Sequence, residues 1–386
     1  MTTSVLIVGA GIVGCSAAHY LAARGVSVTV LDAGAIGGQA STQTAGNLHF
    51  QLSYTAMKGS KAEFEQHTKI LELNLDANRR WRELATDFSG AIDITQNGGV
   101  VVAETDGDRD ALRQKSELER RAGFTTTYLD REELAERVPE VSDTIVGGSW
   151  HADEGWVNAR TVCYELARRA EFDGAQFVLN SFVTGIRRRG GSWAVRAGDR
   201  SFVADTIIVA AGAWTQKVAA LADAVVPMHA SALTMSVSNS SPPIMSRLVM
   251  HASRPLSLKQ VSSGNVMIGG GRRATLLEAA SPLGWSTEPV LESIVGGIDD
   301  CGRVVPAARG LSVIRSWQGL LGSPADEIPV IGEVPGRPGM IVAVAGHTGY
   351  TLGPSCGWAA AQIAMRERTD VDAARFTPSR FAGASA

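Results

Sequence analysis

Three glycines near the start of the chain have the spacing Gly9-x-Gly11-x-x-Gly14. Between a strand and a helix, this spacing permits a tight turn and lets the backbone approach a pyrophosphate closely. The helix that follows would direct unpaired N–H groups and a partial positive charge toward the phosphates. Asp32 lies 18 positions after Gly14, where a carboxylate can accept hydrogen bonds from a ribose diol and would repel a 2′-phosphate. These residues predict a dinucleotide site.

The elements expected around this motif are those that a dinucleotide site requires. Residues 5–8 are apolar and predict a buried strand, and residues 15–24 predict a helix that Gly25 stops. Residues 26–31 alternate as a second strand that ends in Asp32. Glycines at this spacing match by chance fairly often in a chain with 42 glycines, so this β-α-β context is what makes the motif specific.

Small residues and hydroxyl groups dominate the stretch after Asp32, where they would let the backbone wrap around a flat, polar ligand. This stretch runs Ala33-Gly34, then Gln39-Ala40-Ser41-Thr42 and Ala45-Gly46-Asn47. Two later stretches are similar in composition. Ala211-Gly212-Ala213-Trp214 follows a predicted strand at 205–209, and residues 346–354 precede an apolar helix predicted from Gly357.

The remaining pattern predicts the other elements of the chain. We expect a helix at 61–88, a charged and solvated helix at 108–122, and a helix at 288–298. A further helix at 159–172 would be capped by Asn158. Short strands interrupted by Ser, Pro and Gly are expected between about 225 and 315. This layout predicts a nucleotide-binding domain built from the beginning, middle and end of the chain, with an antiparallel domain inserted twice.

Composition excludes several classes of protein. With 386 residues, 45% of them hydrophobic and 19% charged, the chain is neither disordered nor a coiled coil. A net charge of -3, with Arg187–Arg189 as the single basic cluster, gives no footprint for nucleic acid. The four cysteines form no CxxC pair, which argues against a metal site or a disulfide framework and favours a cytoplasmic protein. No apolar run is long enough to predict a membrane span.

Together these motifs resemble the FAD flavoproteins of the glycine oxidase, sarcosine oxidase and D-amino-acid dehydrogenase family. The resemblance covers nearly the whole chain. Its strongest marks are residues 9–14, 31–34, 211–214, 329–332 and 346–354. Finer features look closest to the B-type chain of opine oxidases. They are residues 39–41 leading to 45–52, Leu258-Lys259-Gln260, Gly264-Asn265 and 268–271.

The resemblance implies an α/β fold with a Rossmann-like FAD-binding domain and an inserted antiparallel-sheet substrate domain. The FAD-binding domain would comprise 1–80, 145–220 and 320–386, and the substrate domain 81–144 and 221–319. The residues expected to bind the cofactor are Gly9, Ala10, Gly11, Ile12, Val13, Gly14, Asp32, Ala33, Gly34, Gln39, Ala40, Ser41, Thr42, Ala45, Gly46, Asn47, Leu48, Val183, Ala211, Gly212, Trp214, Gly346, His347, Thr348, Gly349, Tyr350, Thr351 and Leu352. Non-covalent FAD is expected, because 319–322 lacks the cysteine that carries flavin in covalently flavinylated sarcosine oxidases.

The chain departs from the family at the carboxylate of the substrate. Glycine oxidases carry an Arg after a Trp-x-Gly-Leu element, where this chain has Leu321. Lys259 and Arg315 are the two cations expected to replace it. The resemblance also places His49 and Gln51 opposite the flavin, and Tyr350 at the edge of the active site, although each could be structural.

The resemblance implies a dehydrogenase that oxidises the CH–NH bond of an amino acid or an opine. The neutral amine would give hydride to flavin N5, and the imine would hydrolyse to a 2-oxo acid. Such chemistry needs no dedicated acid–base residue, because alignment and exclusion of water are sufficient. Two alternatives are a stand-alone glycine, sarcosine or D-amino-acid oxidase that uses dioxygen, and a non-catalytic FAD-binding subunit. The opine-oxidase likeness further implies a hetero-oligomer with an A-type nucleotide-binding subunit and a small iron–sulfur subunit.

Overall fold

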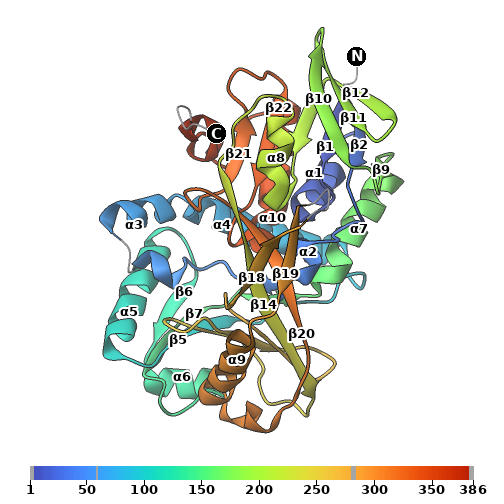
Figure 1. The fold of residues 1–386 in the computed structure, drawn as a ribbon. Helices are drawn as coiled ribbons and strands as arrows, with labels where there is room; N and C mark the ends of the chain where they lie inside the picture. Colours follow the sequence, from blue (N-terminus) through green and yellow to red (C-terminus); the bar gives the residue numbers. More distant parts are fainter. Residues whose placement is uncertain (1–3, 58–59, 280–283, 382–386) are drawn as a thin grey trace.

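The computed structural model describes residues 4–57, 60–279 and 284–381. Two large sheets organise these residues, one in the upper half and one in the lower half of Figure 1. The blue, green and orange-red segments that meet in the upper half show that the beginning, middle and end of the chain come together there. No helix within the described residues is long and apolar enough to cross a membrane.

A six-stranded sheet forms the upper half. Its order is β21-β22-β13-β1-β2-β9, and every neighbouring pair is parallel except β21 with β22. The strands are β1 (Ser4–Val8), β2 (Ser27–Leu31), β9 (Gln176–Val178), β13 (Thr206–Val209), β21 (Val330–Glu333) and β22 (Met340–Val344). Both faces of β1 are buried: Ile7 joins one apolar cluster, and Leu6 joins the cluster on the opposite face. Burial on both faces explains why 5–8 is a continuous apolar run.

Three helices pack together on one face of this sheet. They are α1 (Ile12–Ala22), α7 (Ala159–Phe172) and α10 (Gly349–Ala364). The expectation that the last helix starts at Gly357 was wrong, because Gly353 and Gly357 lie inside α10. A Cβ at Gly353 would lie 2.6 Å from Ile12, and one at Gly357 would lie 2.7 Å from Ser16. These glycines therefore allow α10 to approach α1 closely. Asn158 caps α7 as predicted, accepting a hydrogen bond from Arg160 N.

A three-stranded antiparallel sheet and a short helix cover the opposite face. The sheet consists of β10 (Val183–Arg189), β11 (Ser192–Ala197) and β12 (Arg200–Ala204), and the helix is α8 (Thr215–Ala220). Trp193 and Val195 of β11 pack against Leu6 and Val209 in the second apolar cluster. The parallel sheet is thus sandwiched between two layers, as parallel sheets require.

The second large sheet has ten strands and is mostly antiparallel. Its order is β19-β18-β14-β17-β16-β15-β5-β7-β6, with β20 paired to β14. These strands are β5 (Gly99–Ala103), β6 (Thr126–Leu129), β7 (Gly147–His151), β14 (Met228–Ser240), β15 (Leu248–His251), β16 (Ser257–Gln260), β17 (Asn265–Gly269), β18 (Arg273–Glu278), β19 (Trp285–Glu288) and β20 (Val313–Pro324). The short strands expected between about 225 and 315 are present as β15–β19, of four to six residues, but β14 in the same region has 13 residues and β20 after it has 12. Pairing along almost their full length allows both strands to be long. A small sheet, β3 (Asn47–Leu48), β8 (Gly155–Val157) and β4 (Ile94–Thr95), lies beside the large one.

The proposed domain limits disagree with two strands of this sheet. β7 falls inside the 145–220 segment assigned to FAD binding, yet it pairs with β5 and β6. β20 spans the proposed limit between 319 and 320 and pairs with β14 on both sides of it. The division into two domains therefore stays a prediction, whose limits split β20 and separate β7 from the strands that pair with it.

Three helices differ from the sequence prediction. The helix expected at 61–88 is two helices, α3 (Lys61–Thr68) and α4 (Leu71–Asp87), and the one expected at 288–298 is α9 (Leu291–Val304). The helix expected at 108–122 is α5 (Asp106–Arg121), but it is not fully solvated. Lys115 and Glu119 on α5 are completely buried and paired with each other, because polar side chains from other elements meet them in the interior.

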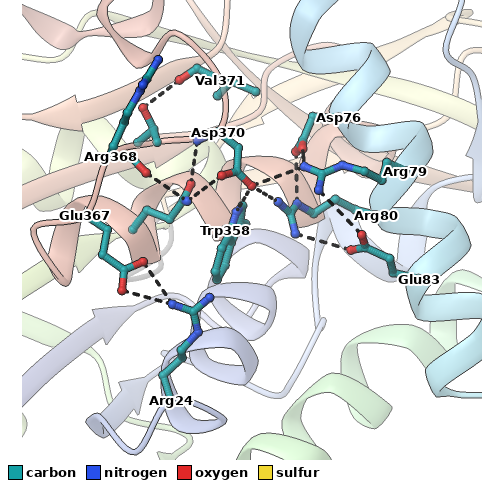
Figure 2. Close-up of polar contacts among 12 residues, drawn as sticks. Arg24, Asp76, Arg79, Arg80, Glu83, Trp358, Glu367, Arg368, Asp370 and Val371 are labelled. Atoms are coloured by element: carbon teal, nitrogen blue, oxygen red, sulfur yellow. Dashed lines mark hydrogen bonds and ion pairs between the residues drawn. The ribbon is translucent and has the colours of Figure 1, made fainter.

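A charged cluster attaches the C-terminal segment to the helices (Figure 2). The buried Arg80 on α4 pairs with Asp76 at 3.1 Å and with Asp370 at 2.7 Å. Its guanidinium also lies 4.7 Å from the ring centroid of Trp358, whose indole N–H donates to Asp370. These contacts join α4, α10 and residue 370 near the end of the described chain.

Candidate active site

A cavity of about 720 Å³ runs along the ends of the parallel strands and reaches the second sheet. Segments that are distant in sequence line it together. They are the turn after β1, the stretch after Asp32, residues 181–184 before and in β10, residues 210–214 with Lys217, Val218 and Leu221 in and around α8, Leu233 and Met235 of β14, residues 319–322 of β20, and residues 343–347 with Gly349 and Tyr350 between β22 and α10. Ligands of open parallel sheets bind at this edge, beyond the carboxyl ends of the strands.

The glycine turn has the geometry that the spacing predicted. Gly9 has a φ of 114°, and a Cβ there would lie 2.3 Å from Ala210 O. A Cβ on Gly14 would lie 1.9 Å from Gly9 O, so helix and turn can pack only with glycine at this position. Gly11 faces the cavity, and the nearest atom to an added Cβ is Ser41 Oγ at 3.1 Å. The same hydroxyl accepts a hydrogen bond from Ile12 N at the start of α1.

Asp32 organises the far side of this turn. Its Oδ2 accepts a hydrogen bond from Ala10 N, and its Oδ1 accepts one from Gly34 N, both at 2.7 Å. The carboxylate is only partly buried and lines the cavity. Its remaining lone pairs can therefore accept hydrogen bonds from a ribose diol.

Two helices begin at this cavity. Ile12 and Val13 of α1 and Gly349 and Tyr350 of α10 line its wall. Neither helix has an acidic residue in its own first turn, so each N-terminus keeps a partial positive charge toward the cavity. Such termini favour anionic ligand groups. The narrow glycine cradle, the Asp32 carboxylate and these two helix ends fit a dinucleotide that carries a pyrophosphate.

The structure brings most of the predicted cofactor residues to the cavity. Those that line it are Gly9, Gly11, Ile12, Val13, Asp32, Ala33, Gly34, Gln39, Ala40, Ser41, Val183, Ala211, Gly212, Trp214, Gly346, His347, Gly349 and Tyr350. Those that do not are Ala10, Gly14, Thr42, Ala45, Gly46, Asn47, Leu48, Thr348, Thr351 and Leu352. Several of this second group support the first: Thr42, for example, donates a hydrogen bond to Gly37 O in the loop after Asp32.

Lys259 is placed differently from the expectation. Its side chain on β16 is buried, and its ammonium donates to Ala45 O and, at 2.8 Å, to Asn47 Oδ1. Burial lowers the pKa of Lys259 to about 7. The side chain does not line the cavity. Lys259 therefore holds the 45–47 segment and is not oriented to bind a carboxylate in the cavity.

Arg315 also lies away from the cavity. It is exposed on β20, and its guanidinium lies 5.8 Å from the ring centroid of Trp317. The residues of β20 that do line the cavity are 319–322. Leu320 and Leu321 make this wall apolar together with Leu233 and Met235 of β14.

His49 and Gln51 belong to a buried polar network around Glu154. Glu154 Oε1 accepts hydrogen bonds from His49 Nδ1 at 2.6 Å and from the backbone N–H groups of Phe50 and Gln51. Its Oε2 accepts from Gln51 Nε2 at 2.9 Å. Burial alone would raise the pKa of Glu154, but the charge and hydrogen bond of His49 outweigh it and hold the pKa at about 2. Gln51 is thus committed to the interior, where its Oε1 accepts from Lys115. Neither His49 nor Gln51 lines the cavity.

Tyr350 and His347 both line the cavity, but the phenol of Tyr350 is already engaged. Tyr350 Oη donates to Ala159 O at 3.2 Å, and its ring stacks on Trp81 with centroids 5.7 Å apart. Burial raises the pKa of Tyr350 well above its ordinary value. Burial lowers the pKa of His347, which favours the neutral imidazole at this end of the cavity.

Several cavity residues were not predicted from the sequence. They are chiefly Gln43, Thr44, Ser181, Phe182, Lys217, Val218, Leu233, Met235, Leu320 and Leu321. Lys217 could have been suspected, because it follows the Ala211–Trp214 signature by one helical turn. Leu233 and Met235 gave no local signal: they are alternate residues of a long strand, and pairing with β20 decides which face they present.

The profile of the DAO family, described as FAD dependent oxidoreductase, matches residues 4–363. The chain therefore belongs to this family of FAD-dependent oxidoreductases, and it is an amine or amino-acid oxidoreductase that uses FAD. The fold, the cofactor class and the family resemblance expected from the sequence are thereby confirmed.

Individual relatives resemble the chain over almost its whole length. Glycine oxidase of Bacillus subtilis (strain 168) is 26% identical over 376 residues, covering 95% of this chain and 94% of that protein. The B-type chain of opine oxidase from Agrobacterium tumefaciens (strain Ach5) is 27% identical, with 97% and 96% covered. The crystal structure of glycine oxidase from Geobacillus kaustophilus superposes with a TM-score of 0.85 at 22% identity, covering 98% of this chain and 99% of that one, so the two share a fold.

Proposed function

We propose that the chain is an FAD-dependent dehydrogenase that oxidises the CH–NH bond of an amino acid or an opine. The observation that carries this proposal is the single continuous cavity, which joins the dinucleotide cradle after β1 to an apolar chamber on β14 and β20. A cofactor held in the cradle and an amine held in the chamber would lie in the same cavity, as the transfer between them requires.

Residues of this chain would hold the cofactor along the cavity. Asp32 would bind the ribose of the adenosine, and the turn around Gly11 with the start of α1 would bind the pyrophosphate. The start of α10, at Gly349, would favour negative charge on the ring system. When bound, FAD supplies the acceptor for the hydride of the substrate α-carbon, and the resulting imine hydrolyses to a 2-oxo acid.

The apolar wall orients the substrate and excludes water. Leu233, Met235, Leu320 and Leu321 offer no acid or base, which suits oxidation of a neutral amine. Burial lowers the pKa of His347, so the imidazole would stay neutral and would not place a buried positive charge beside the apolar wall. We propose that FAD is bound non-covalently, because none of the four cysteines lines the cavity.

The test is anaerobic bleaching of the flavin. Purified protein that contains FAD is mixed with glycine, sarcosine, D-alanine, iminodiacetate and an opine in the absence of dioxygen, and the flavin absorbance is followed. Reduction by at least one amine supports the proposal, and a matched 2-hydroxy acid serves as control. If no amine of this panel bleaches the flavin and dithionite does, the substrate class is wrong.

A second candidate function is a stand-alone oxidase that passes electrons to dioxygen. Similarity to the Bacillus subtilis glycine oxidase favours it. The two functions separate on reoxidation, because an oxidase regenerates oxidised flavin rapidly in air and forms peroxide, whereas a dehydrogenase needs a dye. Leu321, in place of the carboxylate-binding arginine, favours the dehydrogenase that acts on opines.

We also propose that the chain works in a hetero-oligomer in the cytoplasm, with an A-type nucleotide-binding subunit and a small iron–sulfur subunit. The support is the relative from Agrobacterium tumefaciens, which is one named subunit of an opine oxidase. The chain has no cysteine cluster for an iron–sulfur centre, so electrons would need a partner as relay. Affinity purification from native extract tests this. A tagged chain that elutes alone, fully active and rapidly reoxidised by dioxygen, would contradict it.

A further inference from the structure

One charged side chain in the cavity has no role in the mechanism above. Lys217, on α8, lines the cavity and is exposed. Among the described residues that line the cavity it is the one lysine or arginine, while Asp32 is the one acid. Across the described ranges, no carboxylate lies within ion-pair distance of its ammonium. Its charge is therefore available to a ligand.

Trp285 positions this ammonium, and Trp214 packs against Trp285. Lys217 Nζ lies 4.3 Å from the ring centroid of Trp285 on β19, and the ring of Trp285 lies 5.5 Å from that of Trp214. Trp214, the N-cap of α8, precedes Lys217 by three residues, and both line the cavity. In Figure 1, α8 and β19 lie next to each other where the two large sheets meet.

This cluster of Lys217, Trp214 and Trp285 adjoins the apolar wall. A Cβ on Gly322 would lie 2.4 Å from Ala213 Cα, so the residue before Trp214 is in direct contact with the residue after Leu321. Both Leu321 and Gly322 line the cavity. Lys217 follows Ala213 by four residues, so α8 starts beside the part of β20 where the cation is missing.

We propose that Lys217 binds the carboxylate of the substrate, in place of an arginine at position 321. The inference rests on the proposed function, because it assumes an amine that carries a carboxylate. A carboxylate is a strong acceptor for an ammonium, and the apolar neighbours Leu320 and Leu321 reduce competition from water. The ring of Trp285 holds the ammonium by its negative face and leaves other N–H donors of the ammonium to the ligand.

The alternative occupant is a phosphate of FAD, since the same cavity holds the cofactor. The two roles differ in what the variant loses. If Lys217 binds the substrate, its replacement leaves the FAD content unchanged. If it binds a phosphate of FAD, its replacement lowers the FAD content.

The test measures binding of a simple carboxylate to the FAD-containing protein. Propionate, and propionamide as its uncharged match, are titrated while the flavin spectrum is followed, and bound FAD is quantified after denaturation. The proteins are wild type, Lys217→Met, Lys217→Arg and the control Arg187→Met, which removes an exposed cation on β10 that does not line the cavity.

We expect Lys217→Met to weaken propionate binding by about 10- to 100-fold, the worth of one charge-assisted hydrogen bond. Lys217→Arg should retain most of the affinity, and Arg187→Met should match wild type. Binding of propionamide and FAD content should not change. Three results would overturn the inference: wild-type affinity in Lys217→Met, loss of FAD from that variant, or no propionate binding by wild type. Bleaching by amines reports on the proposed function separately, so either idea can fail alone.

Discussion

The ionised carboxylate of Glu154 should be a large contributor to stability, and Glu154→Gln tests this. Glu154 is fully buried and accepts hydrogen bonds from His49, from Gln51 Nε2 and from two backbone N–H groups. The substitution keeps the volume of the side chain but turns one acceptor into an NH₂ donor that faces other donors. A buried donor left without an acceptor costs the full desolvation of that group.

The size of the effect follows from the pKa. Despite burial, the pairing with His49 lowers the pKa of Glu154 from its ordinary value of 4.5 to about 2. That difference corresponds to about 3 kcal/mol of folding free energy at neutral pH. Because the folded pKa is the lower one, this stability is fully present above about pH 4.5 and is lost as the pH falls toward 2. Wild type and Glu154→Gln should therefore differ by about 3 kcal/mol at pH 7 and converge in acid.

The assay is urea unfolding at several pH values with excess FAD, followed by tryptophan fluorescence. Glu117→Gln is the matched control, because hydrogen bonds from Arg120 and Arg121 also lower the pKa of Glu117 to about 2, but this carboxylate is on the surface. Solvent screens such pairs, so the control should unfold like wild type. Two results would contradict this reasoning. One is that Glu154→Gln lowers the free energy of unfolding at pH 7 by less than about 0.5 kcal/mol; the other is that Glu117→Gln lowers it as much as Glu154→Gln does.

Three further predictions concern the cofactor. Gly11→Val should give colourless protein, because its side chain would enter the cavity beside Ser41 Oγ. The control Gly107→Ala, with no atom within 4 Å of the new Cβ, should stay yellow. A fully yellow Gly11→Val protein would contradict the placement of the pyrophosphate at Gly11. Asp32→Ala should weaken FAD binding by roughly 1.5–3 kcal/mol, because the ribose loses a charge-assisted acceptor. Titration of the apoprotein with FAD measures this, and unchanged affinity would show that the ribose lies elsewhere. Acid precipitation should release all flavin into the supernatant, and fluorescence that stays on the denatured band would reveal a covalent bond.

Much of the cofactor cradle could be predicted because its determinants are local. The turn after β1 needs glycine at 9 and 14 to avoid Ala210 O and Gly9 O, and such steric needs appear in a sequence as spacing. The helix of 159–172 was equally predictable, since its cap and its apolar face lie within one short segment. Family membership followed from several such motifs occurring in order.

The partners of the charged side chains were decided by tertiary structure. Lys259 contacts Ala45, which is 214 positions away, and Glu154 contacts His49 across 105. Such pairs leave no period or spacing in a single sequence. Lys259 was therefore expected to bind a substrate, although its ammonium already donates hydrogen bonds to Ala45 and Asn47. The same holds for Lys217, whose place on the cavity wall depends on α8 meeting β19 and β20. Steric requirements and hydrophobic periodicity can be recognised from residues that are close in sequence. The electrostatic environment of a side chain depends instead on all the charges and dipoles that the tertiary structure places near it.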